Sequence, residues 1–185
     1  MPITILNGST LRDDDLRETG RALREIFATE VTIRRASLKI RDAYDGSRHQ
    51  TNSTALLAQI LAGGLRPSEK QIAVVDVDLF IPILTFVFGE AQLLGSAAIV
   101  STHRLSNQSY GLAPDSGLLL RRLQKEIVHE LGHTFGLYHC RYFECVMRSS
   151  TYVEEIDMKL STPCANCSAM LARSDAEVPV PAIPG

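Results

Sequence analysis

The sequence predicts an α/β fold, or α+β in stricter schemes, with a twisted mixed β-sheet packed on one central helix. Three observations support this. Strand-like and helix-like segments alternate over roughly the first 80 residues, an order typical of parallel sheets. Two strand-like segments, 84–88 and 96–102, then follow without a helix between them, which predicts an antiparallel edge strand. The long apolar helical segment 117–135 supplies the covering helix.

The first half of the chain predicts three strands and two helices. In chain order they are strand 3–6, helix 13–27, strand 31–40, helix 51–61 and strand 71–79. The first helix has apolar residues at helical spacing and acidic residues in its first turn. The strand at 31–40 shows alternating polarity, whereas 71–79 is a nearly continuous β-branched run typical of a buried strand. Gly63, Gly64 and Pro67 are expected to end the second helix.

The second half starts with a break at Pro82. The strand at 84–88 is the expected antiparallel edge, where an extended peptide can add to the sheet by β-augmentation. An ordinary core strand is the alternative for this segment. After the strand at 96–102 comes a loop, and Asp115 or Ser116 is the expected cap of the helix 117–135.

Length and composition indicate one globular domain. The chain has 185 residues, 45% hydrophobic and 22% charged, so we expect a single domain at 1–175 and a flexible proline-rich tail at 176–185. The N-terminus has no signal-peptide pattern and no apolar run is long enough to span a membrane, which predicts a cytoplasmic protein. The net charge of −2 gives no bias toward nucleic acid or anionic membranes. We expect a monomer.

The run HELGHTFGLYHC carries the strongest functional signal. His129 and His133 are four residues apart, so both can direct an imidazole from one helix face to the same metal ion. Glu130 can hold and deprotonate a metal-bound water. Gly136 lets the chain leave the helix, often through positive φ, and the turn brings back His139. Three protein ligands with an open fourth position are typical of a catalytic zinc.

The alternative is an amphipathic helix with histidines placed by chance. It is disfavoured because the run holds three of the chain's five histidines at the spacing that one mechanism requires. The other two, His49 and His103, are expected at the surface or at a strand end.

All four cysteines, Cys140, Cys145, Cys164 and Cys167, lie in the last quarter of the chain. Two disulfides would suit a secreted protein, whereas in a cytosolic chain this spacing favours a structural tetrathiolate zinc site. Free buried thiols and a redox Cys-x-x-Cys pair are the alternatives. Cys140 directly follows a histidine of the motif, so the two metal sites would be linked through one peptide bond.

These motifs together resemble the archaemetzincin family of metzincin metalloproteases. The resemblance is carried by HELGHTFGLYHC, CVM at 145–147 and CANC at 164–167, with support from DVDLFIP at 76–82 and FVFGEA at 86–91. It covers about residues 72–167. One departure is the spacer between the CVM methionine and the CANC motif, which has sixteen residues, one fewer than the family usually has.

The resemblance implies a zincin-like metzincin domain with two zinc ions. Glu130 would be the general base and Met147 would form the Met-turn beneath the metal. The implied ligands are His129, His133 and His139 for the catalytic zinc, and Cys140, Cys145, Cys164 and Cys167 for the structural zinc.

The implied activity is hydrolysis of a peptide or protein substrate by a Glu-assisted, zinc-bound water. Two other classes remain open: a catalytically weak or inactive zinc protein with a binding or regulatory role, and a nucleic-acid-binding module built on the cysteines. The near-neutral charge disfavours the second. Glu90 follows the expected edge strand and is a candidate to meet substrate. Asp76 and Asp78 suggest calcium binding or, more simply, a capping or turn role.

Overall fold

The computed structural model describes residues 1–64 and 68–174. Its main sheet has five strands in the order β2-β1-β5-β8-β7. The strands are β1 (Ile3–Asn7), β2 (Val31–Arg35), β5 (Lys70–Val75), β7 (Gly89–Ala91) and β8 (Ala97–Ser101). Within this sheet the described strands pair in parallel, except that β7 is antiparallel to β8. The expected mixed sheet with an antiparallel edge is therefore confirmed.

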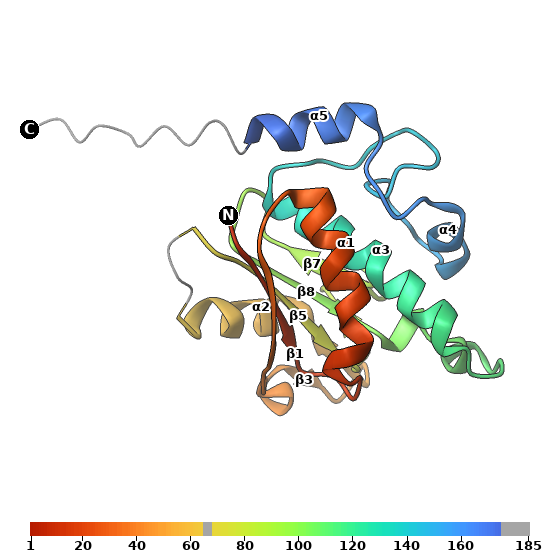
Figure 1. Ribbon diagram of the computed structural model, residues 1–185. Helices are drawn as coiled ribbons and strands as arrows, with labels where there is room; N and C mark the ends of the chain where they lie inside the picture. Colours follow the sequence, from red (N-terminus) through yellow and green to blue (C-terminus); the bar gives the residue numbers. More distant parts are fainter. Residues whose placement is uncertain (65–67, 175–185) are drawn as a thin grey trace, which may run out of the picture.

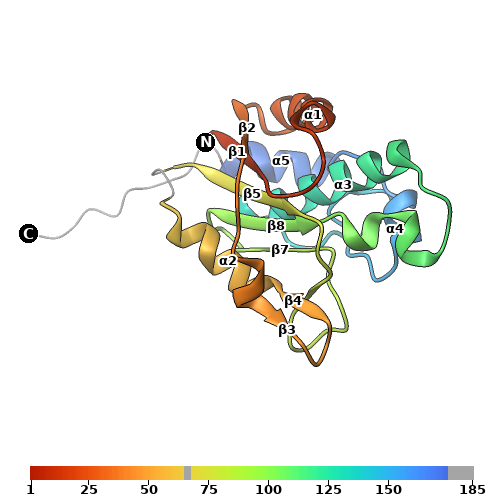
Figure 2. The ribbon, with the colours of Figure 1, turned by 90° about the horizontal axis from the view of Figure 1, so that it is seen from below.

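Three helices cover the two faces of this sheet: α1 (Arg17–Phe27), α2 (Ser53–Ala62) and α3 (Ser116–Thr134). Alternate residues of β5 point to opposite faces, so Ile72 and Val74 join the core beneath α1 and α3, while Ala73 and Val75 pack with α2. Figures 1 and 2 show α1 and α3 on the side of the sheet away from α2.

Smaller elements complete the described chain. A second sheet, also beside α2, contains β3 (Tyr44–Asp45), β4 (Gln50–Asn52) and β6 (Leu79–Phe80). The 3₁₀ helices are η1 (Asp13–Leu16), η2 (Ile40–Ala43), η3 (His103–Leu105) and η4 (Asn107–Tyr110). Two C-terminal helices that the sequence did not predict are α4 (Val153–Met158) and α5 (Ala165–Ser174).

The prediction of an edge strand at 84–88 is wrong, because the antiparallel edge is β7. Within 84–88 only Val87 forms a bridge, an isolated one with Leu79. Side chains bond the backbone here instead of a neighbouring strand: Arg48 donates to the carbonyls of Leu84 and Thr85 at 2.8 and 3.1 Å.

Other predicted boundaries shift for similar local reasons. The strand at 31–40 ends at Arg35, and beyond it the Gln59 side chain on α2 bonds both the N–H and the carbonyl of Lys39. The helix at 51–61 begins at Ser53 because the Asn52 side chain accepts from the Ala55 N–H at 3.1 Å and caps it. The strand at 71–79 divides into β5 and β6, and the helix at 13–27 begins as η1.

The central helix α3 matches its prediction closely. The Asp115 carboxylate accepts from the Leu118 N–H at 2.8 Å and caps the N-terminus. At the other end Gly136 has φ of 93°, and the Leu137 N–H donates to the Gly132 carbonyl at 2.9 Å. This turn directs the chain toward His139. Of the helices in residues 1–64 and 68–174, none has the length and apolar character needed to cross a bilayer.

The predicted proline-rich tail at 176–185, the domain boundary at 175 and the helix stop at Pro67 lie outside the described residues.

Candidate active site

The three histidines of the motif converge at the C-terminal end of α3. The ring centroids of His129 and His133 are 4.7 Å apart. The His139 ring centroid lies 5.3 Å from that of His129 and 5.0 Å from that of His133. Each histidine contributes one ring nitrogen to this cluster, and the three nitrogens all lie within 4.8 Å of one another. The helix supplies the first two rings, and the turn at Gly136 supplies the third.

Hydrogen bonds fix the orientation of two of these rings. The Nδ1–H of His129 donates to the Val146 carbonyl at 2.8 Å, and the Nδ1–H of His133 donates to the Leu137 carbonyl at 2.7 Å. With Nδ1 protonated, each Nε2 carries a lone pair available to a metal. The two Nε2 atoms are 3.1 Å apart. Zinc–nitrogen bonds of about 2.0–2.1 Å in a tetrahedron give an edge of about 3.3–3.4 Å, so this spacing fits zinc.

The surroundings keep these imidazoles neutral. Burial lowers the pKa of His129 well below its ordinary value, and the positive charge of Lys159 and the neighbouring His133 lower it further. Burial also lowers the pKa of His133 and, together with Lys159, that of His139. Neutral imidazole is the form that binds metal.

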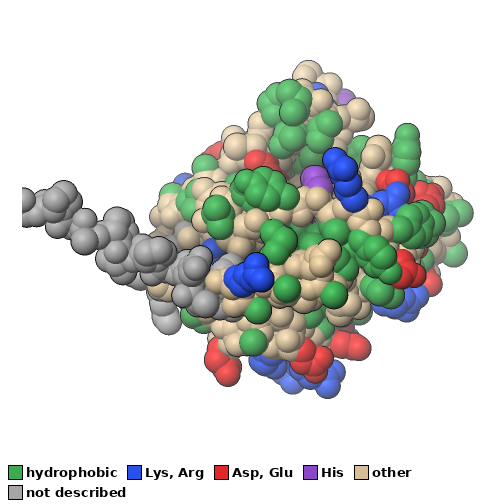
Figure 3. All heavy atoms as spheres, turned by 90° about the horizontal axis from the view of Figure 1, so that it is seen from above, with side chains coloured by type: hydrophobic (Ala, Val, Ile, Leu, Met, Phe, Trp, Pro, Cys, Tyr) green, Lys and Arg blue, Asp and Glu red, His purple; other side chains and the backbone are tan. Residues whose placement is uncertain are grey.

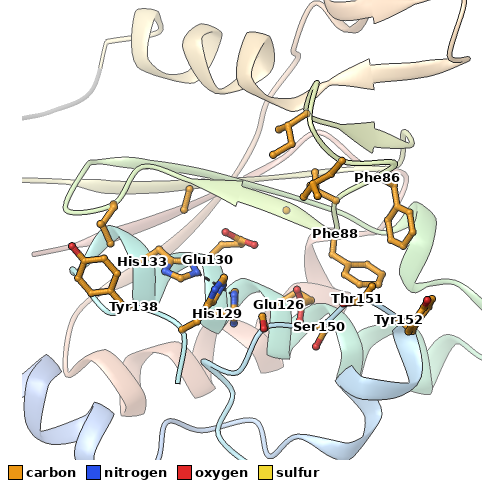
Figure 4. Close-up of a pocket in the computed structure, with 18 of the residues that line it drawn as sticks. Phe86, Phe88, Glu126, His129, Glu130, His133, Tyr138, Ser150, Thr151 and Tyr152 are labelled. Carbon is orange, nitrogen blue, oxygen red and sulfur yellow. Dashed lines mark hydrogen bonds between the residues drawn. The ribbon is translucent and has the colours of Figure 1, made fainter. Parts of the chain in front are cut away.

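Glu130 lies beside His129 and His133 in the cleft, as Figure 4 shows. Burial and the charges of Glu126 and Glu90 raise its pKa well above the ordinary range. A Cβ at Gly89 on β7 would lie 2.7 Å from Cγ and 2.8 Å from Oε1 of Glu130. The glycine therefore leaves the space that this carboxylate occupies.

A buried ion pair, Lys159 with Glu126, lies next to His129 and shares a hydrogen-bond acceptor with it. The Lys159 Nζ lies 3.4 Å from the Glu126 carboxylate, and their side chains are 1% and 4% exposed. The same Nζ donates at 3.4 Å to the Val146 carbonyl, which also accepts from His129. Glu126 is three residues before His129 on the same helix face, a spacing that makes it visible in the sequence. Lys159 has no comparable signal.

Met147 packs beneath the metal-binding face of α3. Its side chain is fully buried, and a Cβ at Gly132 would lie 2.4 Å from its sulfur. Gly132 therefore allows this close approach, directly before His133 in the chain. The Met-turn role that the resemblance implies for Met147 stays a prediction.

The four cysteines form a second cluster beside the first. All four are free thiols, with Sγ–Sγ distances of 3.8 Å for Cys140–Cys164 and for Cys145–Cys167. A disulfide needs about 2.05 Å, whereas four zinc–sulfur bonds of about 2.3 Å in a tetrahedron give an edge of about 3.8 Å. The donor set and spacing fit a structural zinc. The backbone N–H of Cys167 helps to lower the pKa of Cys164 to about 7, which favours the thiolate.

The two clusters share a backbone segment. This segment begins at Cys145, a member of the thiol cluster. The carbonyl of the next residue, Val146, orients the His129 ring. The carbonyl of Met147 accepts a hydrogen bond from the Cys140 N–H at 2.9 Å. Displacement of the thiols would therefore move groups that hold the histidines.

A cleft of about 850 Å³ runs along the exposed side of the histidines. Its lining includes Glu126, Glu130, Phe86, Phe88 and the segment 149–152. Figure 3 shows hydrophobic side chains gathered around a histidine on this face. The sequence did not single out the aromatic residues or the segment 149–152 as parts of the site.

The remaining candidates lie outside the cleft. Glu90 points to the other face of β7, where it accepts from Ser53 at 2.5 Å and from Thr54 at 2.9 and 3.0 Å, so it does not line the cleft. Asp76 accepts from the Thr10 N–H and the Thr102 hydroxyl, a turn role, and Asp78 pairs with Arg104. His49 and His103 are exposed, as expected.

The fold and site together define a class of protein, the zinc metallopeptidases. The profile of Peptidase family M54 matches residues 68–173. An archaemetzincin of Natronomonas pharaonis is 37% identical over 158 residues, which covers 84% of this chain and 90% of the relative. An archaemetzincin of Methanocaldococcus jannaschii is 35% identical over 169 residues, which covers 90% of each chain.

Solved structures agree. The crystal structure of the Methanopyrus kandleri archaemetzincin superimposes with a TM-score of 0.84 at 33% identity and covers 96% of both chains. A zinc-dependent peptidase from Methanocorpusculum labreanum gives a TM-score of 0.81 at 28% identity, covering 91% of this chain and 99% of that one. The chain belongs to the archaemetzincins, peptidase family M54.

Proposed function

We propose that this chain hydrolyses peptide bonds with Glu130 as the general base and with His129, His133 and His139 as ligands of a catalytic zinc. The observation that carries the proposal is the buried Glu130 carboxylate beside three converged, neutral imidazoles in an open cleft. Bound zinc would act as a Lewis acid on the attacking water and on the substrate carbonyl.

Glu130 would take the proton of the attacking water at its carboxylate and later deliver it to the leaving amine. Burial raises the pKa of Glu130 above its ordinary value, which favours uptake of the proton by the carboxylate. The Nδ1–H bonds of His129 and His133 hold the rings in place throughout.

The free edge of β7 would bind the substrate backbone. Two hydrogen bonds flank the β7–β8 ladder, from the Ser101 N–H to the Phe88 carbonyl and from the Gln92 N–H to the Ala97 carbonyl. Because hydrogen-bonded pairs alternate in an antiparallel ladder, the backbone groups of Gly89 and Ala91 face away from β8. Both residues line the cleft. We propose that an extended substrate adds there as an antiparallel strand.

The cysteine cluster would hold a second, structural zinc, giving two ions per chain. Its closed set of four thiols leaves no position for a water or substrate. Its contribution is to fix the segment 145–147, which contacts both clusters.

The test is digestion of a broad peptide library by the zinc-loaded chain. We expect cleavage that stops on chelation of the labile ion and returns when zinc is restored. The matched variant His133→Ala should lose one zinc per chain and all cleavage. A fully loaded wild-type chain that cleaves nothing would favour the alternative, a zinc protein with a binding or regulatory role.

A further inference from the structure

One end of the cleft forms a slot with aromatic walls. It lies along α3 beyond the histidines, on the side away from Tyr138 (Figure 4). We call it the aromatic subsite and define it by Phe86, Phe88, Glu126 and Ser150. The Phe86 and Phe88 rings contact each other edge to face, with centroids 5.3 Å apart.

The walls of the aromatic subsite are held in place without a ligand. The Arg104 guanidinium lies 4.5 Å from the Phe86 ring centroid, and two hydrogen bonds from Arg104 to Asp78, at 2.8 and 2.6 Å, fix the guanidinium. Phe88 is only 5% exposed, and its carbonyl is bonded to the end of β8. A preformed slot loses little conformational entropy when a ring enters it.

The aromatic subsite also has a polar end. Among the residues that the structure describes, the Ser150 hydroxyl is shielded from water and has no hydrogen-bond partner. Glu126 is 3% exposed and meets Lys159 through one carboxylate oxygen. A shielded hydroxyl without a partner is unfavourable, so a ligand that offers a hydrogen-bonding group there gains affinity.

The charges at this end exclude ionised ligand groups. Lys159 already balances Glu126, so an incoming ammonium or guanidinium would meet a buried cation of like sign. An incoming carboxylate would face Glu126 and, next to it in the cleft, Glu130. The ligand group that fits is neutral, apolar in its body and able to both donate and accept a hydrogen bond at its tip.

We infer that the aromatic subsite selects a tyrosine of the substrate, on the carboxyl side of the bond that is cut. The phenol ring would pack against the Phe86 and Phe88 rings, with its hydroxyl at Ser150 and Glu126. The direction of the bound substrate decides on which side of the cut bond the tyrosine lies. Phe88 directly precedes β7, and a substrate strand antiparallel to β7 extends its carboxyl-terminal part toward Phe88. This inference rests on the proposed peptidase function and assigns its substrate class.

The experiment uses capped hexapeptides Ala-Ala-Ala-Xaa-Ala-Ala with tyrosine, phenylalanine or lysine at Xaa. The zinc-loaded chain should cut the bond before tyrosine, with kcat/KM about tenfold above the phenylalanine peptide and higher still above lysine. Mass spectrometry locates the cut. In Ser150→Ala the tyrosine-to-phenylalanine ratio of kcat/KM should fall toward one. The control Ser149→Ala, an exposed neighbour on the same segment, should keep the ratio.

A binding measurement separates failure of this inference from failure of the proposed function. Calorimetry on zinc-loaded Glu130→Gln should show the same preference for the tyrosine peptide without cleavage. If wild type cuts no peptide but this binding preference and its loss in Ser150→Ala persist, the peptidase proposal fails and the subsite assignment stands. Equal use of tyrosine and phenylalanine, faster use of lysine, a cut after tyrosine, or an unchanged ratio in Ser150→Ala would overturn the inference.

Discussion

At the residue scale, the glycine at position 89 decides where the Glu130 carboxylate can lie. A Cβ there would be 2.6 Å from the Ile99 carbonyl and 2.7 Å from the Glu130 Cγ. The Ile99 carbonyl belongs to the backbone of β8, which is paired on both sides and cannot move easily. The Glu130 side chain would therefore have to move instead. The site therefore requires a residue without a Cβ at this position, beyond any need for a flexible backbone.

We predict that Gly89→Ala lowers kcat/KM by at least about tenfold and the free energy of unfolding by about 1–3 kcal/mol. Zinc content should not change, because the histidines are untouched. Steady-state kinetics and thermal unfolding measure the two effects. The control is Gly46→Ala, where an added Cβ meets nothing within 4 Å. Full activity in Gly89→Ala would show that Glu130 does not need this space.

The sequence predicts which histidines the fold brings together, because one mechanism fixes their spacing along the chain. His129, Glu130 and His133 depend only on helix periodicity, and His139 depends on one turn at Gly136. The partners that orient them are distant in sequence. Val146 and Lys159 act through a carbonyl and a buried ammonium, and no local pattern predicts that they meet at His129.

At the element scale, capped and strongly periodic segments are predicted best. Helix α3 begins at its expected Asp115 cap, and β8 lies within its expected range. The segment 84–88 misleads because its apolar residues serve as walls of a cleft and contact one another, while side chains such as Arg48 satisfy its backbone. Helices α4 and α5 are short and irregular in pattern, so tertiary contacts and the cysteine cluster decide them.

The contact between the segment after β5 and η3 gives a pH-dependent prediction. Burial opposes ionisation of Asp78, but hydrogen bonds from Arg104 and Gln50 outweigh it, so the Asp78 pKa is lowered below 3.8. A lowered folded-state pKa contributes stability above the unfolded value, and that stability is lost as the pH falls through the folded value.

Asp78→Asn should therefore lower the free energy of unfolding by about 1–2 kcal/mol at pH 7, a difference that shrinks between about pH 4 and pH 2. Denaturant unfolding across this pH range measures it. The exposed residue Asp42 provides the control, since Asp42→Asn should have little effect at any pH. A difference between Asp78→Asn and wild type that is the same at pH 7 and pH 2 would contradict the assignment.

At the scale of the whole molecule, the two candidate metal sites differ in the part of the fold that each would stabilise. Two of the three histidines, His129 and His133, lie on a helix that packs on the main sheet, so the core holds them with or without an ion. The cysteine cluster instead joins the chain after α3 to the start of α5, a region with little regular structure of its own. Loss of a structural zinc therefore acts on folding first and on chemistry second.

Cys164→Ser should bind one zinc fewer per chain and melt at least about 5 °C below wild type. Asn166→Ser, an exposed change between the two cysteines of the same motif, should melt like wild type with two ions bound. Metal analysis and calorimetry give both quantities. An unchanged melting temperature in Cys164→Ser would remove the structural role from the cysteine cluster.

The central claim is that Glu130 moves the proton in a zinc-dependent peptide hydrolysis, and one measurement tests it most directly. The kcat/KM of Glu130→Ala is compared with that of wild type at equal, verified zinc content on the same peptide. We predict that Glu130→Ala keeps its zinc, since the residue is not a ligand, and loses about 10²–10⁴-fold in kcat/KM. A zinc-loaded Glu130→Ala chain that cleaves the peptide as fast as wild type would contradict the account.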